Sequence, residues 1–271
     1  MKKLFTFALA AATLVGFSAC SNDEENVSND QCRIILGVTT ENSIATRAEG
    51  TPVQDISNWY AIVTQEFGDN DVAYGTEGSW KQIGSNLGTT DFKSGKYTIA
   101  VASHTSVESA NASNGNYGEP YYTKTVTGQQ INPGNNNIAI ECGKTQNAKF
   151  VIDASGFSGT ALVVNVTSPV TLSFDKYAET PTIGNPAFFA ATTTLTYSIT
   201  YTINGITNTL SGKTLRLGAA GTESTLTIKS NDNGRIVLSI TYDNEYNTGT
   251  SGEIEIDAAT GADVTPVTPE P

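Results

Sequence analysis

Few side chains in this sequence are of the kinds that catalyse reactions, and their spacing matches no known catalytic pattern. The chain of 271 residues has one histidine, His104, and no GxSxG turn that would hold a nucleophilic serine. It also lacks the glycine-rich patterns GxGxxG and GxxxxGK[ST] that bind dinucleotides and phosphates. The sequence therefore predicts a protein that is not an enzyme and that needs no cofactor.

Oxygen-rich runs and cysteines give no metal site either. The runs 69–71 (DND) and 231–234 (NDNG) carry calcium-type ligands, but neither is followed by the glutamate of an EF-hand loop, so both are predicted to be turns. Cys32 and Cys142 belong to no CxxC pair, and each alternates with apolar residues, which indicates buried thiols on strands. The sequence leaves open whether they form a disulfide in an oxidising compartment.

Two tryptophans offer a different type of contact. Trp59 and Trp80 could line a sugar platform or pack in a core, because an indole ring has a large apolar face that suits both uses. We keep both as candidate glycan contacts, with core packing as the more common use of tryptophan.

Residues 1–19 are predicted to be a signal peptide that ends at a lipid-attachment cysteine. Lys2 and Lys3 precede an apolar stretch, 4–17, that is shorter than the roughly 20 residues a membrane-spanning helix needs. Residues 17–20 (FSAC) resemble a bacterial lipobox, in which small residues precede a cysteine that receives acyl chains. We therefore predict acylation of Cys20, which would anchor the chain to a membrane.

The chain is acidic, and this restricts its partners. Its formal net charge is −12 at pH 7, so it repels nucleic-acid phosphates and anionic lipid head groups. Residues 20–31 include an acidic run that we interpret as a solvated tether. No later stretch approaches 18 continuous apolar residues, so the predicted contact with the membrane is made through the acyl chains.

The elements that carry these residues are predicted to be strands throughout. Apolar and polar residues alternate, and turn residues recur about every 8–12 positions. Many short strands joined by turns predict an all-β protein with two antiparallel β-sandwich domains, 32–145 and 146–262, followed by a disordered tail, 263–271. The predicted strands are 32–39, 58–66, 96–103, 121–127, 137–142, 148–153, 160–166, 170–174, 194–203, 206–211, 224–230, 235–242 and 252–257.

The clearest local prediction is a hairpin at 204–205 (NG), because Asn-Gly suits the two positive-φ positions of a type I′ turn. The two-residue loop sets the pairs Ile203–Ile206, Thr202–Thr207, Thr200–Thr209 and Ser198–Ser211. One face then carries hydroxyl groups, and the other face is apolar, with Leu195, Tyr197, Ile199, Tyr201, Ile203, Ile206 and Leu210. The hydroxyl face suits water, and an ice-binding or glycan-binding face is the alternative.

A small-residue stretch, 43–50, follows the first predicted strand and contains Arg47. Such a segment is either a plain linker or a protease substrate, since proteases cleave flexible, exposed chain. We therefore name Arg47 as a candidate processing site.

Several features together resemble the fimbrillin-like lipoproteins of Bacteroidetes, and more closely a related lipoprotein family of unknown function. They are the lipobox, the acidic start, which is similar to the surface-export signal of Bacteroidetes lipoproteins, and residues 45–48 (ATRA), 94–102 (SGKYTIAVA), 119–122 (EPYY) and 138–142 (IAIEC). The resemblance implies two transthyretin-like sandwich domains, a lipoprotein precursor and cleavage after Arg47. The cut would remove strand 32–38, and a strand of the next subunit would fill the groove by β-augmentation.

The resulting expectation is a surface-anchored lipoprotein of the outer membrane, or of a fimbrium, with a structural or adhesive role as a pilus subunit or accessory. Its expected partners are the membrane through Cys20, other pilin-like subunits, and a glycan or host-surface ligand. The alternative is a glycan-binding surface lipoprotein of a nutrient-uptake system, with Trp59 and Trp80 as contacts.

Overall fold

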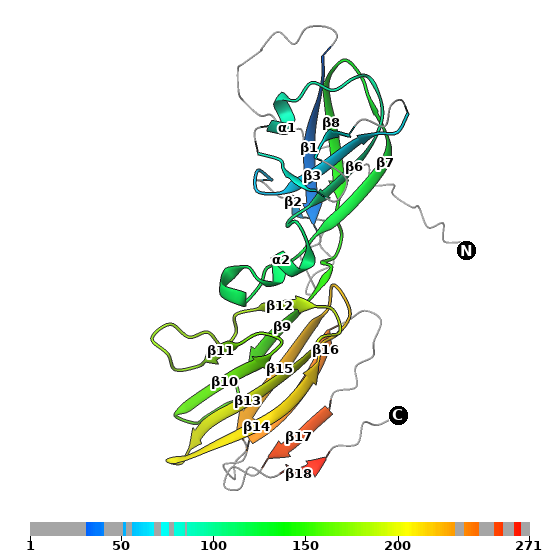
Figure 1. Ribbon diagram of the computed structural model, residues 1–271. Coiled ribbons are helices and arrows are strands. Elements are labelled where there is room, and N and C mark those ends of the chain that lie inside the picture. The colour runs from blue at the N-terminus through cyan, green and yellow to red at the C-terminus, as the bar shows by residue number, and fades with distance from the viewer. Residues whose placement is uncertain are drawn as a thin grey trace, which may run out of the picture.

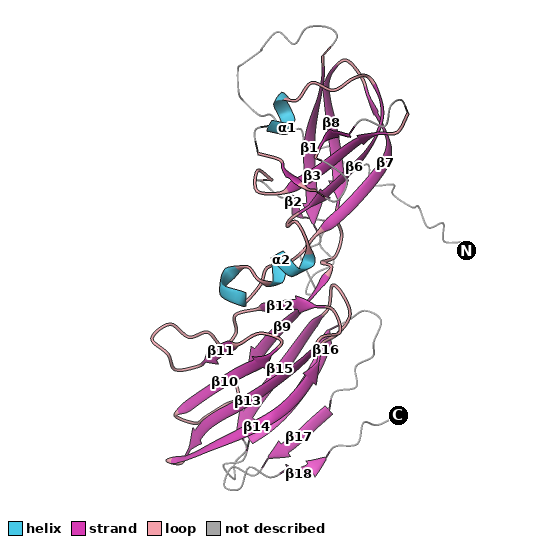
Figure 2. Ribbon diagram, in the orientation of Figure 1, coloured by secondary structure: helices cyan, strands magenta, loops and turns pink. Residues whose placement is uncertain are grey.

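The computed structural model is mostly β, with several antiparallel strand pairs and few helices (Figures 1 and 2). The structure describes residues 31–40, 51–52, 56–67, 72–75, 79–84, 86–230, 236–243, 252–256 and 263–266. The strands are β1 (Cys32–Thr40), β2 (Thr51–Pro52), β3 (Tyr60–Gln65), β4 (Val72–Tyr74), β5 (Lys81–Gln82), β6 (Gly95–Ala102), β7 (Thr123–Ile131), β8 (Gly134–Glu141), β9 (Asn147–Asp153), β10 (Ala161–Ser168), β11 (Leu172–Asp175), β12 (Ala187–Ala190), β13 (Thr194–Ile203), β14 (Ile206–Arg216), β15 (Glu223–Ser230), β16 (Ile236–Asp243), β17 (Gly252–Ile256) and β18 (Asp263–Pro266). The helical segments are α1 (Asn86–Thr89), α2 (Val107–Asn111) and the 3-10 turn η1 (Asn114–Asn116).

The described part of the chain from residue 31 to residue 142, here called the N-terminal half, contains two sheets. Their strand orders are β2-β1-β8 and β4-β3-β6-β7, and β5 pairs with β3. Apolar residues that alternate along the strands of both sheets fill one core, for example Ile34 on β1, Val63 on β3, Ile99 on β6 and Ile140 on β8. Burial of such side chains is the main favourable contribution to folding, roughly 1.5–3 kcal/mol each.

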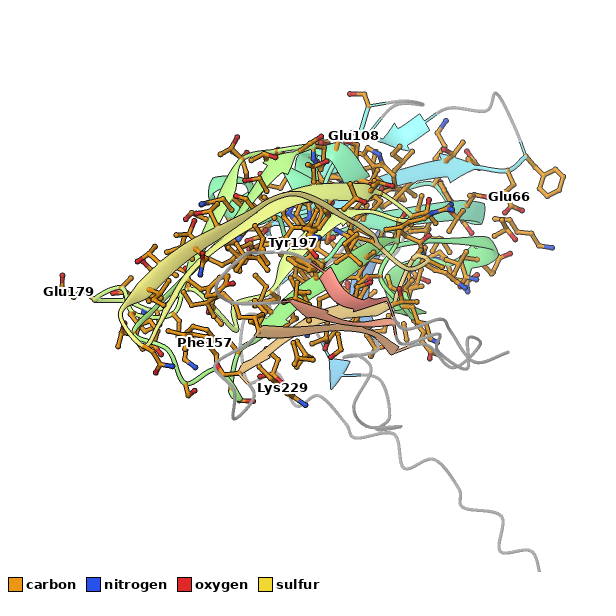
Figure 3. The ribbon with its side chains drawn as sticks, turned by 90° about the horizontal axis from the view of Figure 1, so that it is seen from below. Glu66, Glu108, Phe157, Glu179, Tyr197 and Lys229 are labelled. Carbon is orange, nitrogen blue, oxygen red and sulfur yellow. The ribbon has the colours of Figure 1, made fainter. Side chains whose placement is uncertain are left out.

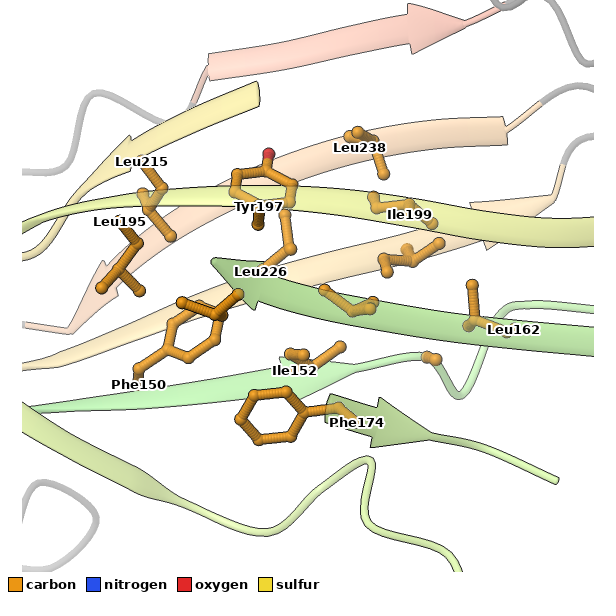
Figure 4. Packing of buried hydrophobic residues seen from close by; sticks show 14 of the residues in the cluster. Phe150, Ile152, Leu162, Phe174, Leu195, Tyr197, Ile199, Leu215, Leu226 and Leu238 are labelled. Carbon is orange, nitrogen blue, oxygen red and sulfur yellow. The ribbon is translucent and has the colours of Figure 1, made fainter. Parts of the chain in front are cut away.

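The described residues from 147 to 266, here called the C-terminal half, also form two sheets. Their orders are β11-β10-β13-β14 and β12-β9-β15-β16-β17-β18. The second core lies between them, where Phe150 of β9 meets Phe174 of β11 edge-on at 6.0 Å and Tyr197 and Ile199 of β13 face Leu226 of β15 (Figure 4). The division of the chain into two transthyretin-like domains remains a prediction.

Two strand pairs differ from the predicted antiparallel arrangement. β1 runs parallel to β8 over eight residue pairs, and β15 runs parallel to β9. Alternation along a strand indicates which face is buried but not which strand lies beside it, and parallel pairing needs a long connection. Here the connection between β1 and β8 includes the whole of the other N-terminal sheet, so the sequence pattern alone could not reveal it.

The hairpin at Asn204-Gly205 is confirmed near its turn. Both residues have positive φ, 53° and 76°, and the pairs Ile203–Ile206, Thr202–Thr207 and Thr200–Thr209 form as predicted. The predicted Ser198–Ser211 pair is wrong, because β14 has one extra residue there and the register shifts beside Gly212 (φ 66°). Such a bulge is common on an edge strand, where it discourages pairing with another chain.

The outer strands and the chain ends complete the comparison with the sequence predictions. All the short strands β2, β4, β5 and β12 were missed, since two to four residues show little alternation. The predicted disordered tail differs in part, because Asp263–Pro266 forms β18 beside β17 and places its proline at the end of an edge strand, where an N–H is not needed. The signal peptide, Cys20, most of the tether, Arg47 and the predicted turns at 69–71 and 231–234 lie outside the described residues. Within the part that is described, no helix has both the length and the hydropathy to cross a membrane.

Candidate functional site

Strand β1, the first of the described strands, lies between two neighbours that hold it very unequally. It pairs with β8 along eight residues, from Cys32–Gly134 to Thr39–Glu141, but with β2 through two residue pairs only. The side chains of Cys32, Ile34 and Val38 are at most 2% exposed and belong to the N-terminal core. β1 is therefore a core strand that is held mainly by one neighbour.

The two ends of β1 are fixed by backbone hydrogen bonds to separate parts of the N-terminal half. At its start, the Phe92 N–H donates to the Cys32 carbonyl (2.9 Å), and the Gly134 N–H donates to the Gln31 carbonyl (2.7 Å). At its end, the Cys142 N–H donates to the Thr39 carbonyl (2.9 Å). These contacts set the register of the strand in the core.

The two buried cysteines lie at opposite ends of this strand pair. Cys32 faces Gly134, whereas Cys142 follows the Thr39 end. At about 3.3 Å per residue the two cysteines are roughly 25 Å apart, whereas a disulfide needs Cα atoms within about 7 Å. Both are buried, as the alternation predicted, and both are free thiols. Burial raises the pKa of Cys142 to about 11. The structure thus decides against the disulfide that the sequence left open.

The two tryptophans are placed differently. Trp59 is 9% exposed and stacks on Tyr122 with ring centroids 6.1 Å apart, so it belongs to the core. Trp80 lies between β4 and β5 and is half-buried. The candidate glycan contact therefore depends on Trp80 and remains a prediction.

The hydroxyl face of the β13–β14 hairpin forms as expected. Thr200 and Thr209 share a hydrogen bond of 3.1 Å between their hydroxyl oxygens, and Thr202 and Thr207 share one of 2.8 Å. On the opposite face the predicted apolar residues are buried, except that Ile206, beside the turn, is 54% exposed. Ile206 is the first residue of the edge strand β14, directly after the turn.

Ser103, His104 and Glu119, from the segment between β6 and β7, lie in the order of a hydrolase triad. Ser103 Oγ is 3.1 Å from His104 Nδ1, and His104 Nε2 is 2.9 Å from Glu119 Oε2. The Ser103 hydroxyl has two acceptors within reach, His104 Nδ1 and the Pro120 carbonyl (3.2 Å), and its oxygen accepts the Tyr122 N–H (3.0 Å). The hydroxyl therefore contributes hydrogen bonds that hold the backbone of residues 120–122.

A cavity of about 240 Å³ lies between the end of β9 and the β11–β12 loop. Its polar side chains are engaged internally, because Lys176 Nζ donates to the carbonyls of Ala154 and Phe157, and Asp153 accepts the Ser155 N–H (2.9 Å). Phe157 and Lys229 lie close by at the same end of this half (Figure 3). Within the described ranges, no group of three or more His, Cys, Asp or Glu side chains is placed to hold a metal ion.

Comparisons with known proteins give structural neighbours only. No family model matches the sequence, and no curated protein matches it. One similar solved structure is a candidate cell adhesion protein of Bacteroides ovatus, with 12% identity, covering 79% of this chain and 96% of that chain, at a TM-score of 0.44. Another is a fimbrial assembly protein of Parabacteroides distasonis, with 13% identity, 78% and 98% coverage and a TM-score of 0.36. The tip fimbrial protein Mfa3 of Porphyromonas gingivalis is a third, with 9% identity, 69% and 93% coverage and a TM-score of 0.30.

Proposed function

We propose that the protein is a surface-anchored lipoprotein with a structural or adhesive role, namely a fimbrial subunit or accessory that assembles by strand exchange. The observation that carries the proposal is β1, a core strand that precedes Arg47 in the sequence and pairs extensively with β8 alone. A cut after Arg47 would break the covalent connection between β1 and all the other described strands and helices.

Loss of β1 would leave a groove with two kinds of unsatisfied group. The side of β8 that faces β1 would lose its backbone partners along eight residue pairs. The core would lose Cys32, Ile34 and Val38, which alternate along β1 with a period of two. A strand of another subunit with small or apolar residues at alternate positions would restore both, as in other cases of β-augmentation.

The positions of the cysteines support this route. Because Cys32 and Cys142 lie too far apart to be bridged, no disulfide between them would tether the excised strand. We further propose that each half is one transthyretin-like sandwich domain, since each has a core of its own. Acylation of Cys20 would hold the precursor at the outer membrane before the cut.

The first experiment is the mass of the mature N-terminus in protein taken from native membranes and from sheared surface material. A chain that starts at Ala48 in the sheared material supports strand exchange, and it should disappear in Arg47→Ala but persist in the control Arg216→Ala. An acylated Cys20 in every fraction would overturn the assembly mechanism.

The rate at which the Cys142 thiol is labelled is a second measurement, and it reports whether the groove is filled by a strand or empty. The thiol is buried beside the end of β1, so a maleimide should label it slowly in the intact chain. Labelling should become fast when β1 has been cut away and slow again after a new strand has entered. Equal labelling in all three states would contradict the exchange.

Surface glycan binding is the second candidate, and the half-buried Trp80, whose indole ring could stack on a sugar, favours it. A glycan array tests it with the wild type and with Trp80→Ala. Saturable binding that Trp80→Ala abolishes would support this function, and no binding across the array would exclude it.

A further inference from the structure

The junction between the two halves contains more than the connecting chain 143–146. The segment between β6 and β7 belongs to the N-terminal half, yet it reaches the first strands of the C-terminal half through α2 and the residues after it (Figure 1). Four of these residues, 119–122, are bonded to both halves. We call them the junction strand, although they form a short coil segment that ends where β7 begins.

On the N-terminal side, the junction strand is bonded to the end of β6. The Ser103 N–H donates to the Tyr122 carbonyl (2.9 Å), and the Tyr122 N–H donates to Ser103 Oγ (3.0 Å). The same hydroxyl donates to the Pro120 carbonyl, and His104 pairs with the Glu119 carboxylate. The triad-like group of Ser103, His104 and Glu119 therefore helps to attach the junction strand to the N-terminal half.

On the C-terminal side, the junction strand is bonded to the start of β9. The Tyr121 N–H donates to Asn147 Oδ1 (3.1 Å), and the Gln146 N–H donates to the Tyr121 carbonyl (2.7 Å). Asn147 Nδ2 donates to the Glu119 carbonyl (2.8 Å) and to Asn111 Oδ1 (3.1 Å). Successive residues, Tyr121 and Tyr122, thus bond to opposite halves, as neighbouring residues of an extended chain can.

Asn147 is the centre of this arrangement. It is 0% exposed, and its side-chain oxygen and nitrogen both have partners, so the cost of burying the amide is offset. Removing the amide would leave the Tyr121 N–H and the Glu119 carbonyl, which lie in a part-buried site, without this partner, and an unpaired polar group that water reaches poorly costs free energy. A buried network of this kind favours one fixed geometry.

Tyr117 adds a second attachment, just before the junction strand. Its carbonyl accepts the Phe188 N–H of β12 (2.7 Å), and its hydroxyl donates to the Ser173 carbonyl of β11 (2.6 Å). The next residue, Gly118, has φ 74°, and a Cβ there would lie 2.6 Å from the Phe188 carbonyl oxygen. The close approach of the two backbones therefore requires glycine at this position.

We propose that the junction strand joins the two halves into one rigid unit, and that the Asn147 side chain makes the central hydrogen bonds of this connection. Because the segment is bonded to both halves, the connection 143–146 does not act as a free hinge. This proposal is independent of any cut at Arg47 and of any ligand.

The test compares full-length wild type, Asn147→Ala and a matched control, Ser224→Ala. Ser224 is also 0% exposed, and its hydroxyl accepts the Gly218 N–H (3.1 Å), so Ser224→Ala removes a buried hydrogen bond within the C-terminal half. Hydrogen exchange followed by mass spectrometry reads the amides of Tyr121 and Gln146, and small-angle X-ray scattering reads the relative arrangement of the halves.

We expect exchange at these two amides to rise at least about tenfold in Asn147→Ala, and the scattering to indicate a wider range of shapes. Ser224→Ala should change neither. Unchanged exchange and scattering in a folded Asn147→Ala would overturn the proposal. If Asn147→Ala does not fold, Tyr117→Phe, which removes only the hydroxyl, should show the same changes to a smaller degree, and no change there would also overturn it.

Discussion

The burial pattern of β1 can be tested with two adjacent residues that have the same side chain. Ile34 is 1% exposed and belongs to the N-terminal core, whereas Ile35 is 45% exposed on the other face of the strand. Replacing a buried isoleucine by alanine removes buried methyl groups and leaves a cavity, which typically costs 2–5 kcal/mol. At an exposed position the same change loses mainly strand propensity, at most about 1 kcal/mol.

We therefore expect Ile34→Ala to lower the free energy of unfolding by at least about 1 kcal/mol more than Ile35→Ala. Guanidinium denaturation measures this, with tryptophan fluorescence as the signal, because Trp59 is buried in the same core. A similar loss in both variants, or a larger one in Ile35→Ala, would refute the placement of β1 and with it the groove on which the proposed assembly depends.

Three further predictions concern other parts of the fold. Hydrogen bonds from the Gly128 N–H and from a threonine hydroxyl hold the pKa of Glu66 below its usual value. The stability that the Glu66 carboxylate contributes is therefore present above the usual pKa of about 4.3 and is lost as the pH falls through the lowered pKa. The Tm difference between wild type and Glu66→Gln should be largest at neutral pH and should close in acid. Gly205→Ala should cost roughly 1–2 kcal/mol in thermal or chemical unfolding, because φ is 76° while nothing lies within 4 Å of the new Cβ, and an unchanged stability would contradict the positive φ. Mass spectrometry of the protein from oxidising conditions should find Cys32 and Cys142 as free thiols. Because the pKa of Cys142 is raised to about 11, its labelling by maleimide in the folded protein should stay slow until the pH approaches that value.

Much of the strand pattern could be read from the sequence, because alternation reports burial directly. β13 begins and ends at the predicted residues, and the Asn204-Gly205 turn has the predicted pairing. The register farther along β14 could not be read, since the bulge beside Gly212 depends on the position of that strand at the edge of its sheet. Local rules thus hold near the turn and fail where tertiary position decides.

The candidate site was predictable in part for the same reason. The alternation of Cys32, Ile34 and Val38 indicated a buried strand before Arg47, but the parallel partner β8 is determined by the whole topology of the N-terminal half. The role of Asn147 was missed, because a polar residue at the start of an apolar strand is usually interpreted as turn chemistry. Its complete burial and its bonds to the junction strand appear only in three dimensions.

The parallel β1–β8 pair also has a consequence for the order of folding. The hydrogen bond from Asn136 Nδ2 to the Arg33 carbonyl joins residues 103 positions apart, whereas β3, β6 and β7 pair with near neighbours in an antiparallel sheet that does not include β1. Contacts of long sequence separation form late, because the entropy of closing the loop must be met first. β1, which precedes the other described strands in the sequence, is therefore expected to dock last, onto a sheet that has already formed without it.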